Sequence, residues 1–242
     1  MVTSVPFGIK GLDDILDGGI VKNSTVLISG SPGTGKTILG LQYLYNGVTQ
    51  YDDRGVYLTF EEHEHDLEEA AESLGLDEWG SLVEDGRITV HDKRHLLELS
   101  DFSSTLDLVL EELEDESIDR LVLDSLTMFQ MFFDNENERR TYLLKLADVL
   151  EIHGVTSLFI HEQSGAFPQT EIGLENFLTD GNIYLTQIPT QSGVDRYIWV
   201  AKMRKKNIDT DFFPMEIGHG GITVHRDAAQ FSLLGGESLS SF

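Results

Sequence analysis

A glycine-rich loop constrains this chain more than any other feature of its sequence. The run Gly30-Ser-Pro-Gly-Thr-Gly-Lys-Thr37 follows the apolar residues 26–28 and precedes apolar positions at helical spacing, Ile38, Leu41 and Leu44. Glycines let the backbone turn sharply and bring its N–H groups close to an anion. The start of the next helix adds unpaired N–H groups and the positive end of its dipole. The pattern therefore predicts a phosphate-binding loop between a buried strand and a helix.

The loop also predicts which residues contact a nucleotide. Lys36 is expected to reach the β- and γ-phosphates, and the Thr37 hydroxyl is expected to ligate Mg²⁺. The loop does not read the base, so GTP stays open beside ATP. The predicted nucleotide contacts are Ser31, Pro32, Gly33, Thr34, Gly35, Lys36, Thr37 and Ile38.

Hydrolysis needs a second magnesium anchor and a group that activates water. Asp124 ends the apolar run 120–123, so its carboxylate should emerge at the carboxyl edge of a sheet and join the Mg²⁺ shell; the alternative is a helix N-cap. Glu61 and Glu62 end another apolar run, and one of them should polarise the attacking water. Glu61 is favoured as the inward residue, although alternation cannot fix a side-chain direction at a strand end. An acid pair in so acidic a chain can also be a solvated helix start.

Two further groups have open interpretations. The cluster Lys202-Met-Arg204-Lys-Lys206, with Arg196 nearby, could be an arginine-finger element that reaches phosphate, a nucleic-acid patch, or a strand edge protected by lysines. His161-Glu-Gln163 could sense the γ-phosphate or form a plain loop. The histidines show no strong metal-binding spacing.

Alternation of apolar strands and amphipathic helices predicts an α/β fold with a mostly parallel sheet covered on both faces. Beyond Gly181 short apolar segments follow one another without helices, which predicts an antiparallel extension of the sheet. We expect one domain over 1–242, with a lead-in over 1–24 that covers an edge of the core and a frayed tail over 235–242. The remaining strands are expected over 55–60, 87–91, 120–124 and 155–160, and the helices over 66–74, 102–116 and 135–152.

Composition narrows the classes of partner. The 42 acidic residues against 17 basic ones give a net charge of -25, which repels nucleic acid and anionic membranes unless basic residues gather locally. The even spread of acids predicts adaptation to a high-salt cytoplasm, as in halophilic archaea; an ordinary acidic protein is the alternative. There is no cysteine, which excludes disulfides and thiolate metal sites. Without a leader or a long apolar run, we expect a cytoplasmic protein with no membrane insertion.

Several motifs together resemble the KaiC family of RecA-like ATPases over nearly the whole chain. They are Gly11-Leu-Asp-Asp-Ile-Leu16, the phosphate loop with Leu41-Gln-Tyr-Leu44, Glu61-Glu62, Leu123-Asp-Ser-Leu-Thr127, Thr179-Asp-Gly181 and Lys202-Met-Arg204. The resemblance implies a RecA-like phosphate-loop fold, Mg²⁺-dependent ATP hydrolysis, and hexameric rings of this chain with ATP at the subunit interfaces. It further implies that the paired glutamates are the catalytic base and that Lys202 and Arg204 contact the neighbour's phosphates in trans. With Lys36, these are the predicted catalytic residues.

Two departures from the family pattern limit what carries over. Clock members carry two such domains, and their second domain has adjacent serine and threonine phosphoacceptors where this chain has Asn176 and Phe177. Autophosphorylation there is not expected; Thr170 and Thr179 are weak candidates. The predicted function is a regulatory or signalling ATPase with an unidentified partner. The rivals are a non-hydrolysing, nucleotide-gated docking protein for a motility or sensory complex, and a recombination-type mediator on DNA, against which the acidic charge counts.

Overall fold

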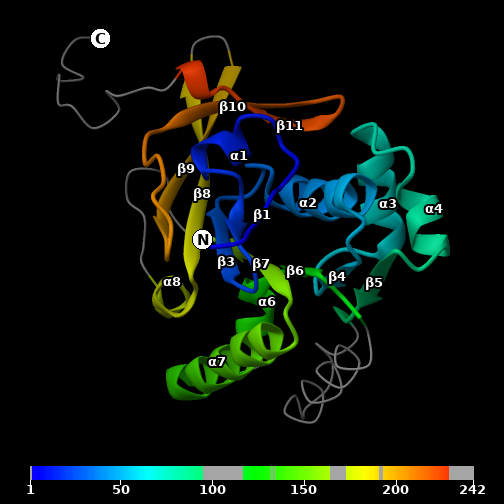
Figure 1. Cartoon of the computed structure of the whole chain (residues 1–242), viewed down its shortest axis with the longest axis vertical. Helices are drawn as coiled ribbons and strands as arrows, with labels where there is room; N and C mark the ends of the chain where they lie inside the picture. Colours follow the sequence, from blue (N-terminus) through cyan, green and yellow to red (C-terminus); the bar gives the residue numbers. More distant parts are fainter. Residues whose placement is uncertain are drawn as a thin grey trace.

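The fold is built on a nine-stranded sheet, in the order β11-β10-β9-β8-β3-β7-β6-β4-β5 (Figure 1). The computed structural model describes residues 2–94, 117–131, 133, 135–163, 173–190 and 193–228. The expected helix over 102–116, the tail over 235–242 and Thr170 lie outside these residues. The parallel strands are β3 (Thr25–Gly30), β4 (Gly55–Thr59), β5 (Ile88–Asp92), β6 (Arg120–Asp124), β7 (Thr156–Glu162) and β8 (Gly181–Thr190).

The antiparallel extension begins one strand later than the sequence predicts. β8 pairs in parallel with β3, and only β9 (Gly193–Met203), β10 (Phe213–Gly218) and β11 (Gly221–Val224) are antiparallel to their neighbours. The chain enters β8 beside the start of β3, where the Asp180 amide donates to the Thr25 carbonyl oxygen (2.8 Å). The Asp180 carboxylate in turn accepts from the Thr25 amide (3.2 Å). This anchor sends β8 in the same direction as β3.

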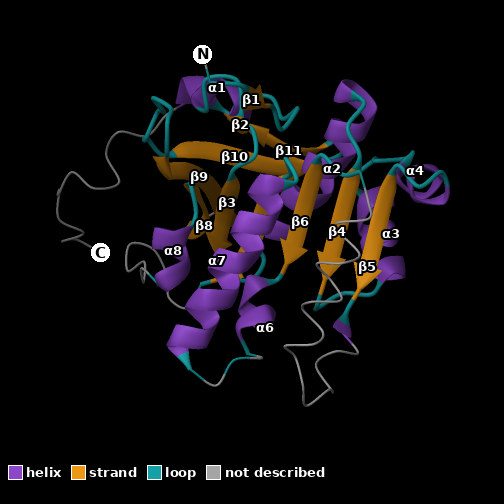
Figure 2. Ribbon diagram, turned by 60° about the horizontal axis from the view of Figure 1, so that its bottom comes forward, coloured by secondary structure: helices purple, strands orange, loops and turns teal. Residues whose placement is uncertain are grey.

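Helices cover both faces of the parallel strands, as the alternating pattern predicts (Figure 2). On one face α2 (Lys36–Tyr51), together with α3 (Glu64–Ser73) and α4 (Trp79–Glu84), shares a core with Val122. On the other face α7 (Glu136–Ile152) shares a second core with Leu121 and Leu123. The short helix α6 (Leu126–Gln130) directly follows β6, and the short helix α8 (Leu174–Leu178) directly precedes β8. Among the described helices, none combines the length and apolar character needed to cross a membrane.

The lead-in packs as part of the first core. It contains β1 (Ser4–Val5), α1 (Leu12–Ile15) and β2 (Ile20–Val21), and η2 (Arg226–Ala228) lies against α1. Phe7, Leu12 and Ile15 are almost wholly buried. The Asp13 carboxylate accepts from the amides of Phe7 (2.7 Å) and Gly8 (2.9 Å), which closes the turn before α1.

A buried arginine ties this lead-in to the sheet. Arg120, at the start of β6, is only 1% exposed. Its guanidinium donates to Asp53 Oδ2 (2.7 Å) and to the carbonyl oxygens of Pro6 (2.8 Å) and Tyr43 (3.1 Å). The guanidinium carbon also lies 4.6 Å from the centre of the Tyr43 ring. Arg120 therefore fixes the start of the strand that ends in Asp124.

Candidate functional site

The glycine-rich loop joins β3 to α2 at the carboxyl edge of the sheet, as the sequence predicts. Gly35 precedes α2 with φ 101°, and a Cβ atom there would lie 2.7 Å from the Ile217 side chain. A Cβ on Gly30 would lie 2.5 Å from the Leu185 carbonyl oxygen. The Thr34 hydroxyl and the Lys36 ammonium both donate to the Ser31 carbonyl oxygen, at 2.8 and 3.1 Å. Close packing and backbone conformation thus both require glycine in this loop.

A pocket of about 430 Å³ opens over the start of α2. Glu62 enters its lining from the end of β4, Arg196 from β9 and Ile217 from β10. The Nε of Arg196 is buried and has no hydrogen-bond partner within the described part of the chain. From the sequence, Arg196 is grouped only with the basic cluster, and its place in this pocket is not predicted. The other lining residues are Gly33, Gly35, Lys36, Thr37 and Ile38.

The two predicted magnesium ligands lie together. The Thr37 hydroxyl donates to Asp124 Oδ2 over 2.9 Å, and the Tyr57 phenol donates to the same oxygen over 2.6 Å. Burial raises the pKa of Asp124, while these two hydrogen bonds oppose the shift. Among the described residues no cluster of His, Asp or Glu could enclose a metal alone. A hydroxyl beside one carboxylate suits Mg²⁺, which binds few protein oxygens and takes the rest from phosphates and water.

The paired glutamates have different surroundings. Thr59 ends β4, and its hydroxyl accepts from the amides of Glu61 (3.2 Å) and Glu62 (3.0 Å) and donates to the Glu62 carbonyl oxygen (3.0 Å). This turn ends the strand alternation. Glu62 is partly buried and lines the pocket, whereas Glu61 is exposed and accepts from the Ser125 hydroxyl. The sequence favours Glu61 as the inward residue, whereas in the structure Glu62 is the one that lines the pocket.

Burial and neighbouring charges shift the pKa values of two pocket residues, Lys36 and Glu62. Burial lowers the pKa of Lys36, and the negative charges of Glu162, Asp124 and Glu61 oppose this shift. Burial raises the pKa of Glu62, and the negative charges of Asp124, Asp66 and Glu61 add to the effect. A raised pKa brings a carboxylate closer to the basicity that a general base needs.

Lys202 and Arg204 lie at the opposite edge of the sheet from the loop. Lys202 pairs with Asn182 at the start of β8 and donates to the carbonyl oxygens of Asn176 (3.1 Å) and Thr179 (2.5 Å). Arg204 donates to Asp180 Oδ1 (3.2 Å) and to the Phe177 carbonyl oxygen (3.2 Å). Both cations therefore bind the end of α8 in their own chain, and the structure does not bring them to their own phosphate loop.

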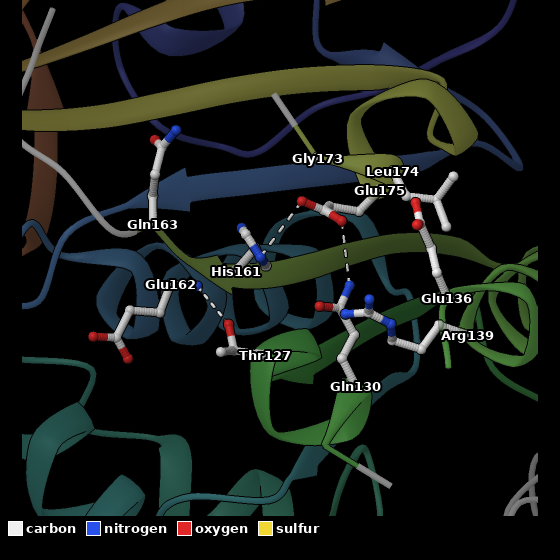
Figure 3. A pocket seen from close by; sticks show the side chains of 10 residues that line it. All are labelled: Thr127, Gln130, Glu136, Arg139, His161, Glu162, Gln163, Gly173, Leu174 and Glu175. Carbon is white, nitrogen blue, oxygen red and sulfur yellow. Dashed lines mark hydrogen bonds and ion pairs between the residues drawn. The ribbon is translucent and has the colours of Figure 1, made fainter. Parts of the chain in front are cut away.

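A second pocket, of about 510 Å³, lies beside the end of β7 (Figure 3). His161 points toward Glu175, with 3.6 Å between Nε2 and Oε1, and Gln130 donates to the other Glu175 oxygen over 3.3 Å. Burial lowers the pKa of His161, and Glu175 opposes this. Glu162 points away from the pair, and its amide donates to the Thr127 hydroxyl (2.8 Å). His161 and Glu162 belong to β7 itself, one strand from the loop, so a role in sensing the γ-phosphate stays a prediction.

Comparison with known proteins identifies the family. A family model described as "ATPase: KaiC" matches residues 5–229, and this is nearly the whole chain. The chain belongs to the KaiC family of ATPases. A KaiC-like protein from the hyperthermophilic archaeon Pyrococcus horikoshii OT3 has a similar crystal structure, with a TM-score of 0.81 and 31% identity over 93% of this chain and 100% of that one. The predicted RecA-like fold is thereby confirmed.

Clock proteins of the family are also similar in sequence. The circadian clock oscillator protein KaiC of Prochlorococcus marinus strain MIT 9313 is 29% identical over 92% of this chain and 46% of its own length. The protein of the same name from Acaryochloris marina is 30% identical over 92% of this chain and 44% of its own length. The chain thus spans less than half the length of these relatives, so their activities as whole proteins do not carry over directly.

Proposed function

We propose that this chain binds and hydrolyses ATP with Mg²⁺ as a ring-forming regulatory ATPase. One observation carries the proposal. Thr37 donates a hydrogen bond to Asp124 at the carboxyl edge of the sheet, and Glu62 lines the loop pocket at the same edge. A nucleotide-binding protein without hydrolysis would not need a partly buried carboxylate of raised pKa beside the loop. Family membership supports the choice of ATP.

The chain's own residues have distinct proposed roles. Glu62 accepts a proton from the attacking water, and Ser125 holds Glu61 beside it. Lys36, the loop amides and Arg196 bind the phosphates and stabilise the charge that develops on them. Thr37 and Asp124 would hold Mg²⁺, which neutralises charge on the β- and γ-phosphates.

Lys202 and Arg204 are proposed to act on the neighbouring subunit. Along β9, Lys202 lies six positions after the pocket residue Arg196. This is about 20 Å at about 3.4 Å per residue, too far for one chain to use both in one site. The acids lie at the carboxyl edge and these cations at the amino edge, so head-to-tail contacts would bring opposite charges together. If such contacts close on themselves, they form a ring. We expect a hexameric ring, because the resemblance to the clock members of the family implies one.

Mixing two inactive variants tests the shared site. One variant carries Glu61→Gln and Glu62→Gln, and the other carries Lys202→Ala and Arg204→Ala. In randomly mixed rings, a complete site needs the loop side of the second variant and the cation side of the first, so an equal mixture should recover about one quarter of wild-type turnover.

Labelled copies of the two variants establish that mixed assemblies form. Mixed assemblies without recovered turnover would refute the shared site, and full activity of the Lys202/Arg204 variant would refute the trans role. ATP binding by the wild-type protein without any turnover would instead support the nucleotide-gated docking function.

A further inference from the structure

The Tyr57 hydroxyl is buried beside Asp124, one of the two residues of the proposed metal site. Tyr57 lies in the middle of β4, and its side chain is wholly buried. β4 pairs with β6 so that Tyr57 faces Val122 and Thr59 faces Asp124. Tyr57, Val122 and Asp124 therefore share the α2 face of the sheet, because alternate residues of paired strands point the same way. This register brings the phenol to the Asp124 carboxylate.

Two donors of different origin converge on one oxygen. Asp124 Oδ2 accepts from the Tyr57 phenol (2.6 Å) and from the Thr37 hydroxyl (2.9 Å). The Tyr57 ring has little freedom to move, because it is wholly buried in the close-packed core shared with α2. Thr37 is the proposed metal ligand, so its hydroxyl serves two partners. The Tyr57 phenol donates its one proton to Asp124, and the Thr37 hydroxyl lies within hydrogen-bonding reach of both groups.

We propose that Tyr57 is a positioning residue that orients Asp124 for Mg²⁺. The proposal rests on the proposed magnesium-dependent function. Tyr57 would not touch the metal or the nucleotide; it would hold Oδ2 through its hydroxyl and leave Oδ1 for the metal shell. Removing a hydrogen-bonding partner behind a metal ligand typically lowers metal affinity by about 10-fold to 100-fold.

The test measures the free Mg²⁺ concentration that nucleotide binding requires. A fluorescent, non-hydrolysable ATP analogue is titrated at increasing free Mg²⁺, and the Mg²⁺ midpoint is compared among the intact protein and its variants. In Tyr57→Phe the midpoint should rise about tenfold. Turnover of the same variant should return to near the wild-type rate at saturating Mg²⁺.

Tyr43→Phe is the matched control. Tyr43 is equally buried in the same core, and its hydroxyl donates to the Thr156 carbonyl oxygen over 3.1 Å, away from the metal site. This variant also loses one buried hydroxyl and should keep the wild-type Mg²⁺ midpoint. Thermal unfolding in EDTA without nucleotide shows whether both variants fold. An equal rise in both midpoints would overturn the proposal by assigning the effect to general loss of stability.

A double-mutant comparison separates this proposal from the one on which it rests. Asp124→Asn should raise the midpoint further, and adding Tyr57→Phe should then have little extra effect, because the phenol acts through Asp124. A rise with Asp124→Asn but none with Tyr57→Phe would overturn the role of Tyr57 alone. No rise with Asp124→Asn would overturn the magnesium site and the inference together. Independent, multiplied effects would also contradict action through Asp124.

Discussion

Replacing Arg120 by alanine should destabilise the fold more than any surface charge change. The substitution removes the donor from Asp53 and from the carbonyl oxygens of Pro6 and Tyr43. Breaking a buried pair costs about 3 to 5 kcal/mol, because the remaining charge stays buried. The Asp53 side chain keeps 24% exposure, so water can partly hydrate it and the lower end, about 3 kcal/mol, is expected. For a domain of this size that lowers Tm by about 6 to 12 °C.

Arg87→Ala supplies the control. Arg87 donates to Asp52 over 2.8 Å, a distance close to that of the buried pair, but Asp52 is 93% exposed. Exposed pairs contribute at most about 1 kcal/mol and weaken in salt. Urea and thermal unfolding, followed by circular dichroism in EDTA at low and molar KCl, compares the two variants. The Arg120 loss should persist in molar KCl, while the Arg87 loss should shrink to what its hydrogen bond to the Val48 carbonyl oxygen contributes. Equal losses, or an Arg120 loss that vanishes in salt, would refute the reasoning.

Three further predictions concern catalysis and salt. Glu62→Gln should lower kcat by about 10²-fold to 10⁴-fold, and Glu61→Gln by less; the reverse order in steady-state assays would make Glu61 the base. The pH–rate profile should fall on acidification through a pKa above the ordinary glutamate value of 4.5, since burial raises the pKa of Glu62 and the base must be ionised. Glu61→Gln should keep this fall, and its disappearance would count against Glu62. Because the net charge is -25, repulsion among the acids should destabilise the fold at low salt. Tm should therefore rise as KCl increases from about 0.1 M to molar concentration, where the Debye length falls to a few ångströms. A flat or falling Tm would contradict halophilic adaptation.

Local patterns were sufficient for the parts of the fold that local physics determines. The phosphate loop, with its glycines and the Lys36-Thr37 pair, could be read directly, because strand, turn and helix are adjacent in sequence. Asp124 could also be placed, since the ends of parallel strands share one edge. The direction of β8 could not, because it depends on the contact of Asp180 with Thr25, which is distant in sequence.

The parts of the site that were missed depend on register and on turns. Arg196 enters the pocket because of how β9 pairs with β8, and sequence gives no register for these strands. The choice between Glu61 and Glu62 depends on the Thr59 hydroxyl, which turns the chain after β4. Tyr57 resembles any aromatic residue in a buried strand until its hydroxyl is seen beside Asp124. A buried aromatic two residues before a strand end would be a useful signal for such a partner.

The position of Lys202 and Arg204 has a thermodynamic consequence. In the isolated chain these cations are engaged by the end of α8, while Glu62 lines the loop pocket and the charges of Asp124 and Glu61 act on Lys36 there. If a neighbour's cations complete the pocket, ATP binding and subunit association become coupled equilibria. By reciprocity, the factor by which ATP tightens association equals the factor by which association tightens ATP binding. Protein concentration would then act as an effector of nucleotide affinity, and dilution alone would release ATP.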